Sequence, residues 1–94
     1  MNRNRWTRVE VSQRFDLTGG DVVELTDYET GDPPGVVRRL APWGDARWSV
    51  AGPEGDPFID IRLLGDEVLA TSWQGLLHRI GLDDGAVRSV AFVK

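Results

Sequence analysis

Apolar and polar residues alternate along the second half of the chain in a way that predicts a series of short β-strands. The stretch from Phe58 to Leu63 shows the period of two that is typical of a half-buried strand. Four such runs follow one another, at residues 58–63, 67–73, 76–80 and 86–93. Gly-containing turns separate them, and short hairpin connections favour Gly because it adopts positive φ. This half therefore predicts a four-stranded antiparallel meander.

The first half repeats the pattern with longer connections. Residues 35–51, GVVRRLAPWGDARWSVA, echo residues 75–91, GLLHRIGLDDGAVRSVA, with Arg39 over Arg79 and a Ser-Val-Ala triplet in both. Extending the alignment places Val9-Glu10-Val11 over Ile59-Asp60-Ile61, with insertions in the predicted turns at 12–20 and 29–34.

No window shows sustained helical spacing, so we expect an all-β protein made of two tandem four-stranded meanders. A period of 40–50 residues indicates repeat units. We expect a single domain over residues 1–94, with one repeat at about 6–52 and the other at about 53–94.

The stretch from Leu76 to Val87 resembles the turn between the third and fourth strands of quinoprotein-type and WD40-like β-propeller blades. Gly44 is followed four residues later by Trp48, which is similar to the spacing by which quinoprotein blades dock on one another. The second half has Arg88 where the alignment places Trp48, a departure from that pattern. The resemblance implies two propeller-like blades, and such blades carry unrelated functions.

Two blades are too few to close a ring, and each leaves a sheet face open. Propellers use about 4–8 blades, so two, three or four copies of the chain could complete one by cyclic association. On this interpretation we expect a homo-oligomer, from dimer to tetramer. The alternative is a monomer in which the two sheets pack together as a small sandwich.

Composition narrows the classes of partner. The chain has 94 residues, no Cys and a net charge of −4, from 11 basic and 15 acidic residues. A negative surface disfavours nucleic acid and favours a basic protein partner. No apolar run approaches the ~20 residues of a membrane span, so we expect no membrane association and a cytoplasmic location.

The sequence offers no catalytic constellation. His78 is the only His, it falls on a predicted strand, and no Cys accompanies it. Phosphate-binding glycine motifs and the GxSxG elbow are both missing. We therefore expect neither an enzyme nor a cofactor or metal site.

Candidate binding residues fall mainly in the longer connections of the first half. The segment 27–34 would present Tyr28, Glu29 and Asp32 to a partner, with Pro33-Pro34 stiffening the loop; a solvated insertion is the other interpretation. Its carboxylates lack the spacing of an EF-hand. Trp43 falls in a turn and is a candidate binding anchor.

The remaining Trp residues are expected to have structural roles. Trp48 and Trp73 fall on predicted strands and are expected to pack the blades, and Trp6 is expected to close the first sheet.

These features favour a non-enzymatic protein-binding or assembly module, such as an immunity-type or regulatory protein whose acidic surface blocks a basic partner. The alternative is a lectin-like oligomer that binds carbohydrate at blade junctions. The repeats do not duplicate an aromatic site, because Trp43 aligns with Asp83 and Trp48 with Arg88.

Overall fold

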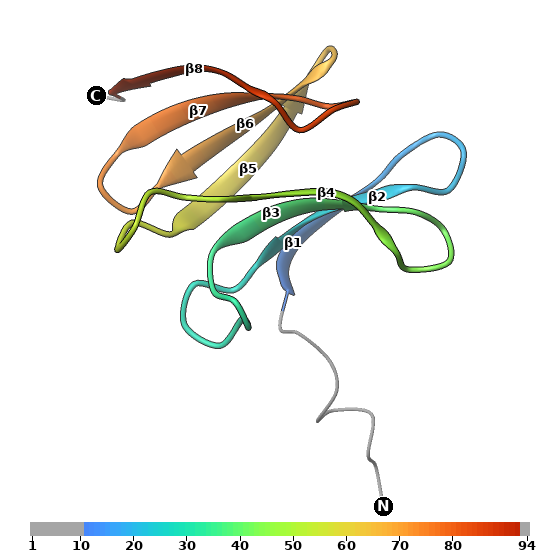
Figure 1. Ribbon diagram of the computed structural model, residues 1–94, viewed down its shortest axis with the longest axis horizontal. Coiled ribbons are helices and arrows are strands. Elements are labelled where there is room, and N and C mark those ends of the chain that lie inside the picture. Colours follow the sequence, from blue (N-terminus) through green and yellow to red (C-terminus); the bar gives the residue numbers. More distant parts are fainter. Residues whose placement is uncertain (1–10, 93–94) are drawn as a thin grey trace, which may run out of the picture.

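The computed structural model describes residues 11–92, and this part of the chain is built from strands and turns without a helix (Figure 1). The strands are β1 (Val11–Asp16), β2 (Val22–Thr26), β3 (Val36–Leu40), β4 (Ala46–Ala51), β5 (Phe58–Leu64), β6 (Glu67–Ser72), β7 (Leu76–Gly81) and β8 (Val87–Phe92). They form two four-stranded antiparallel sheets: sheet 1, in the order β1-β2-β3-β4, and sheet 2, in the order β5-β6-β7-β8. The all-β prediction of two tandem meanders is confirmed, and the two blade-like sheets do not close on themselves.

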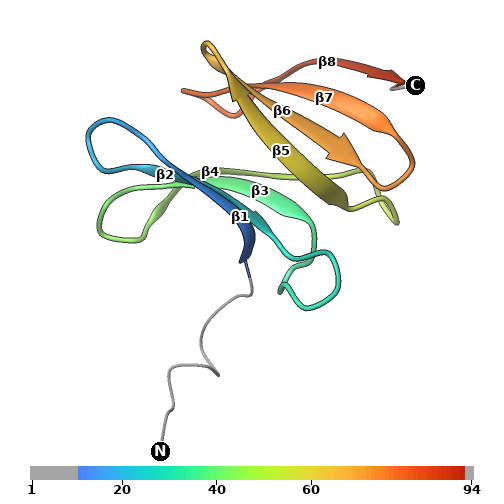
Figure 2. The same cartoon turned by 180° about the vertical axis from the view of Figure 1, so that it is seen from behind.

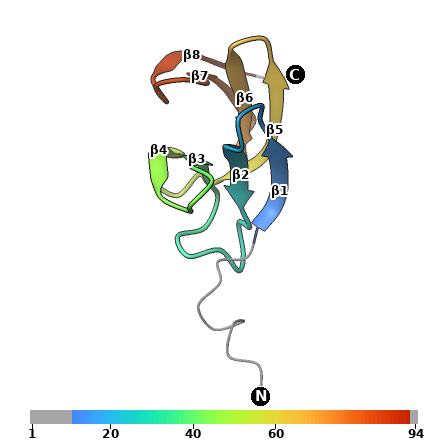
Figure 3. The ribbon, with the colours of Figure 1, turned by 90° about the vertical axis from the view of Figure 1, so that its right-hand side faces the viewer.

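The two sheets pack face to face as neighbouring layers. Figure 3 shows their first strands, β1 and β5, along one edge and their last strands, β4 and β8, along the other. Contacts between the sheets run mainly from β5 to β2 and β3. The core between the layers consists of Val23, Leu25, Val37, Phe58, Ile61, Val68, Ala70 and Ile80, and each of these residues is fully buried.

One side of each sheet therefore faces the other sheet. On sheet 1 we call this the inner face, formed by Gln13, Phe15, Val23, Leu25 and Val37. On sheet 2 the inner face is formed by Phe58, Ile61, Val68, Ala70 and Ile80. A β-bulge between Phe58 and Asp60 explains why Phe58 and Ile61 share a face despite their odd spacing.

The hairpin between β5 and β6 follows the expected turn chemistry. Its connection is only two residues long, Gly65-Asp66, and Gly65 has a φ of 59°. A side chain is disfavoured at positive φ, whereas Gly adopts it without steric cost. This local preference explains why the sequence alone located the turn.

The strand pairings define which positions of the two sheets correspond. Val22 faces Leu40 in sheet 1 as Val68 faces Ile80 in sheet 2. Arg39 faces Trp48, whereas Arg79 faces Ser89. Trp48 therefore corresponds to Ser89, and the aligned Ser-Val-Ala triplets lie one position out of step.

The reason for this shift lies in the turn before the last strand. In sheet 1 the Ala41 N–H donates to the carbonyl of Asp45, and in sheet 2 the Gly81 N–H donates to that of Ala86, each at 2.8 Å. The second turn therefore contains one more residue. The structure replaces the sequence alignment here, because main-chain hydrogen bonds set the register.

The predicted insertion at 12–20 is partly wrong. Residues 12–16 belong to β1, and only the residues after Asp16 form the connection to β2. Val11 pairs with Thr26 as Phe58 pairs with Ser72, so Val11 corresponds to Phe58 and not to Ile61. Val9, Glu10 and the predicted role of Trp6 lie outside the described residues. Residues 11–92 contain no helix that is long and apolar enough to cross a membrane.

Candidate interaction surfaces

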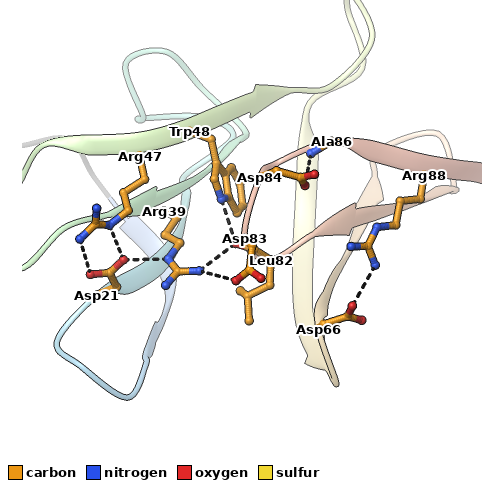
Figure 4. Close-up of polar contacts among 10 residues, drawn as sticks. All are labelled: Asp21, Arg39, Arg47, Trp48, Asp66, Leu82, Asp83, Asp84, Ala86 and Arg88. Atoms are coloured by element: carbon orange, nitrogen blue, oxygen red, sulfur yellow. Dashed lines mark hydrogen bonds and ion pairs between the residues drawn. The ribbon is translucent and has the colours of Figure 1, made fainter.

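Polar contacts fasten the two sheets together at the turn between β7 and β8 (Figure 4). The Trp48 indole Nε1 donates to the carbonyl of Leu82 at 2.9 Å, and an Arg39 guanidinium nitrogen donates to the same carbonyl at 3.0 Å. The Trp48 ring also lies so close to Gly85 that a Cβ there would come within 2.6 Å of it. Trp48 thus packs between the sheets.

A second fastening lies between the first strands of the two sheets. The Gln13 side-chain amide accepts a hydrogen bond from the Ile61 N–H at 2.8 Å and donates one to the Ile61 carbonyl at 3.2 Å. The amide thus pairs with the β5 main chain as a neighbouring strand would. The sequence does not reveal this contact, because Gln13 falls in the segment 12–20 that its pattern predicts to be a turn.

A carboxylate with two arginines occurs at corresponding places in both sheets. Asp21 accepts hydrogen bonds from Arg47 at 2.6 Å and from Arg39 at 2.8 Å (Figure 4). The hydrogen bond from Arg47 lowers the pKa of the Asp21 carboxyl, and Arg39 adds to this against the opposing effect of desolvation.

In sheet 2, Glu67 accepts hydrogen bonds from Arg79 at 2.8 Å and from Arg88 at 3.1 Å. The hydrogen bond from Arg79 lowers the pKa of the Glu67 carboxyl, desolvation opposes it, and Arg88 strengthens it. Arg39 and Arg79 were matched in the sequence, but the one-residue shift hid the match between Arg47 and Arg88. Both carboxylates are paired with cations, which fits structural support better than acid–base chemistry.

The predicted binding residues of the 27–34 segment lie beside a residue from the other sheet. Tyr28 contacts Trp73, with ring centroids 5.3 Å apart, and both side chains are exposed. Trp73 lies in the turn after β6 and is 60% exposed, so its expected burial between blades is corrected. The strand ends one residue earlier than predicted, at Ser72, which points inward in its place.

The connections at this end of the sheets are acidic. The connections 27–35, 52–57 and 73–75 meet at one end of the sheets (Figures 1 and 2). These connections contain no Lys or Arg. They carry five carboxylates, on Asp27, Glu29, Asp32, Glu54 and Asp56. We call this surface the acidic end. A cleft of about 240 Å³ opens here, lined by Pro34 and residues 52–57.

Two of the five carboxylates hold the acidic end in shape. Asp27 accepts hydrogen bonds from the N–H groups of Glu29 at 2.8 Å and Thr30 at 3.0 Å. The bond from Thr30, followed by that from Glu29, lowers the pKa of the Asp27 carboxyl. Asp56 accepts from the Gln74 N–H at 2.8 Å and so ties the β4–β5 connection to the β6–β7 turn. The other three, on Glu29, Asp32 and Glu54, are exposed.

Trp43 lies away from the acidic end, in the turn at the opposite end of β3. It is 70% exposed, and the Arg47 guanidinium lies 5.4 Å from the ring centroid. The structure therefore brings Tyr28, Glu29 and Asp32 into one region and separates Trp43 from them. His78 is buried, and its ring makes a T-shaped contact with the Phe58 ring, with the ring centroids 4.9 Å apart.

Within residues 11–92, no group of three or more His, Cys, Asp or Glu side chains is placed to hold a metal ion. No protein-family model matches the chain, and no curated protein matches it either.

Proposed function

We propose that this chain is a non-enzymatic protein-binding module, built from two propeller-type blades, whose acidic end receives a basic segment of a partner protein. The observation that carries the proposal is the exposed contact between Tyr28 and Trp73, at an end of the sheets whose connections carry five carboxylates and no Lys or Arg. The partner would be recognised by cationic side chains, such as Arg or Lys, presented on an extended segment.

The chemistry of the acidic end fits such a partner in two ways. An aromatic face attracts a guanidinium or ammonium group within about 6 Å, which adds to the attraction of nearby carboxylates. The net charge of −4 steers a basic protein toward the surface and raises the rate of encounter. A large exposed aromatic side chain is also the usual type of binding anchor.

The acidic end is organised before a partner arrives. Asp27 caps its own loop, and the Thr26 hydroxyl accepts from the Val36 N–H and donates to the Pro33 carbonyl, both at 2.8 Å. The Trp73 N–H donates to the carbonyl of Pro57 at 2.8 Å. A surface held in this way loses little conformational entropy on binding, which favours affinity.

Binding of labelled basic peptides tests the proposal. Fluorescence anisotropy would follow a Lys/Arg-rich peptide and an acidic peptide of equal length, at low and high salt. We expect binding of the basic peptide alone, weaker at high salt, and at least about tenfold weaker after Trp73→Ala. Trp43→Ala is the matched control, because it removes an exposed Trp from the opposite end.

A glycan array with the same variants tests the alternative. Sugar binding that is lost with Trp73→Ala, together with no binding of the basic peptide, would replace the proposal with a carbohydrate-binding function. Equal peptide binding by both Trp variants would show that the acidic end is not the binding surface.

A further inference from the structure

The outer face of sheet 2 corresponds position by position to the inner face of sheet 1. The pairings of β1 with β2 and of β5 with β6 match Gln13 to Asp60 and Phe15 to Arg62. The same comparison matches Val23 to Leu69, Leu25 to Thr71 and Val37 to Leu77. In sheet 1 these positions are covered by sheet 2. In sheet 2 they line an open depression of about 260 Å³ that no described residue of the chain fills.

From this correspondence we propose that the outer face of sheet 2 binds the outer face of sheet 1 of a second copy, so that chains join head to tail. The outer face of sheet 1 comprises Arg14, Asp16, Val22, Glu24, Arg38 and Leu40. It corresponds in turn to the inner face of sheet 2. We call the packing of the two inner faces within one chain the internal joint. The proposed joint between chains would therefore repeat the internal joint.

The internal joint shows which residues would meet. Within the chain, Gln13 lies against Ile61, and Phe15 and Leu63, each two residues further along its strand, both pack against the core. The corresponding residues of the outer faces are Asp60 opposite Arg14 of the second copy, and Arg62 opposite Asp16 of the second copy. Uncharged positions of the internal joint are thus replaced by two pairs of opposite charge.

The order of these charges fits the proposed register. Along β5 the order is Asp60 then Arg62, and along β1 it is Arg14 then Asp16. A slip of two residues along the strands would bring like charges together, so the pattern favours a single register. Nothing in the internal joint requires these four charges, because all four side chains are 45–82% exposed, and among the described residues their ion pairs are with their own strand neighbours, at 3.5 and 3.6 Å.

Apolar side chains and a main-chain acceptor complete the match. Leu69 and Leu77 are half-buried on one face, and Val22 and Leu40 are half-buried on the other. Arg79 corresponds to Arg39, and in the internal joint Arg39 donates a hydrogen bond to the Leu82 carbonyl. Pro42 occupies the position of Leu82 in the first sheet, so its carbonyl is the matching acceptor on the second copy.

The joint uses two different surfaces, so association is heterologous: it closes a ring or continues as a filament. Two, three or four chains would give rings of four, six or eight blades, within the range that propellers use. This surface is separate from the acidic end, so peptide binding and self-association stand or fall independently.

Charge reversal tests the joint without altering net charge. One variant carries Asp60→Arg with Arg62→Asp, a second carries Arg14→Asp with Asp16→Arg, and a third carries all four substitutions. Sedimentation velocity and light scattering would measure association of each variant and of the parent. All four residues are surface-exposed, and circular dichroism would verify that each variant is folded.

We expect the parent and the fourfold variant to associate, and each twofold variant to associate at least about tenfold more weakly, because two attractions become two repulsions. An equimolar mixture of the two twofold variants should form mixed pairs, since the charges on each variant are opposite in sign to those that they meet on the other. A parent that stays monomeric up to about 1 mM would overturn the proposal. So would twofold variants that associate as the parent does, or a fourfold variant that fails to recover.

Discussion

Replacement of Trp48 tests how the two sheets are held together. Trp→Ala in a fully buried site costs about 3–5 kcal/mol. Because Trp48 is only partly buried, we take about half of that cost for the loss of its ring packing. Loss of the indole hydrogen bond to Leu82 adds about 1 kcal/mol, and the Leu82 carbonyl keeps its bond from Arg39. We therefore expect Trp48→Ala to lower the free energy of unfolding by about 2.5–3.5 kcal/mol.

Urea denaturation followed by far-ultraviolet circular dichroism is the appropriate assay, because it does not depend on the fluorescence of the Trp being removed. Trp48→Phe separates the two contributions, since it keeps most of the ring packing and loses only the N–H. Trp43→Ala is the matched control at an exposed position, and we expect it to change stability by no more than about 0.5 kcal/mol. Equal effects of the two alanine variants would refute the role assigned to Trp48.

Two further predictions concern polar groups at and near the joint. Gln13→Glu keeps an acceptor but sets a carboxylate oxygen against the Ile61 carbonyl. We expect it to lower the free energy of unfolding, measured by urea denaturation at pH 7, by about 1–3 kcal/mol, which is more than the loss in Gln13→Ala. An unchanged urea midpoint would contradict the two-point contact. The pKa of Asp21 and that of Glu67 are lowered in the folded protein, so the unfolded chain binds protons more readily at these groups as the pH falls. The stabilisation from these two carboxylates is therefore complete above about pH 5 and is lost as the pH falls through their lowered folded-state pKa values. Urea midpoints measured across this range should fall less steeply with pH in Asp21→Asn than in the parent. An identical pH dependence would refute the stabilising role of the Asp21 carboxylate.

The sequence predicted the strands of the second sheet closely, because strand formation there depends on local alternation and on Gly at the turns. The predicted run 58–63 became β5 at Phe58–Leu64, and the run 76–80 became β7 at Leu76–Gly81. The first strand of sheet 1 was less visible. Its outward positions, such as Arg14 and Asp16, are charged, and its inward Gln13 is polar, so it resembles a loop in hydropathy.

The candidate surfaces were predicted only in part. The acidic segment with Tyr28 was singled out from its composition, but its neighbour Trp73 was assigned to the interior because the strand was extended by one residue. Alignment of the two repeats sets Tyr28 over Trp73, 45 positions apart, but it does not predict their contact, which forms only when the sheets stack. The Asp21 and Glu67 clusters were missed for a similar reason, since their arginines come from other strands.

By itself, the sequence determined that this protein is all-β, that it forms two four-stranded meanders, and where most of its turns fall, because alternation and turn chemistry act over a few residues. Tertiary structure alone decided which residues of the two sheets correspond, because one extra residue in the turn between β7 and β8 shifts the match of β8 with β4 by one position. It also decided which sheet face is covered and which is open. Those outcomes depend on main-chain hydrogen bonds and on packing between distant strands, and a linear pattern contains neither.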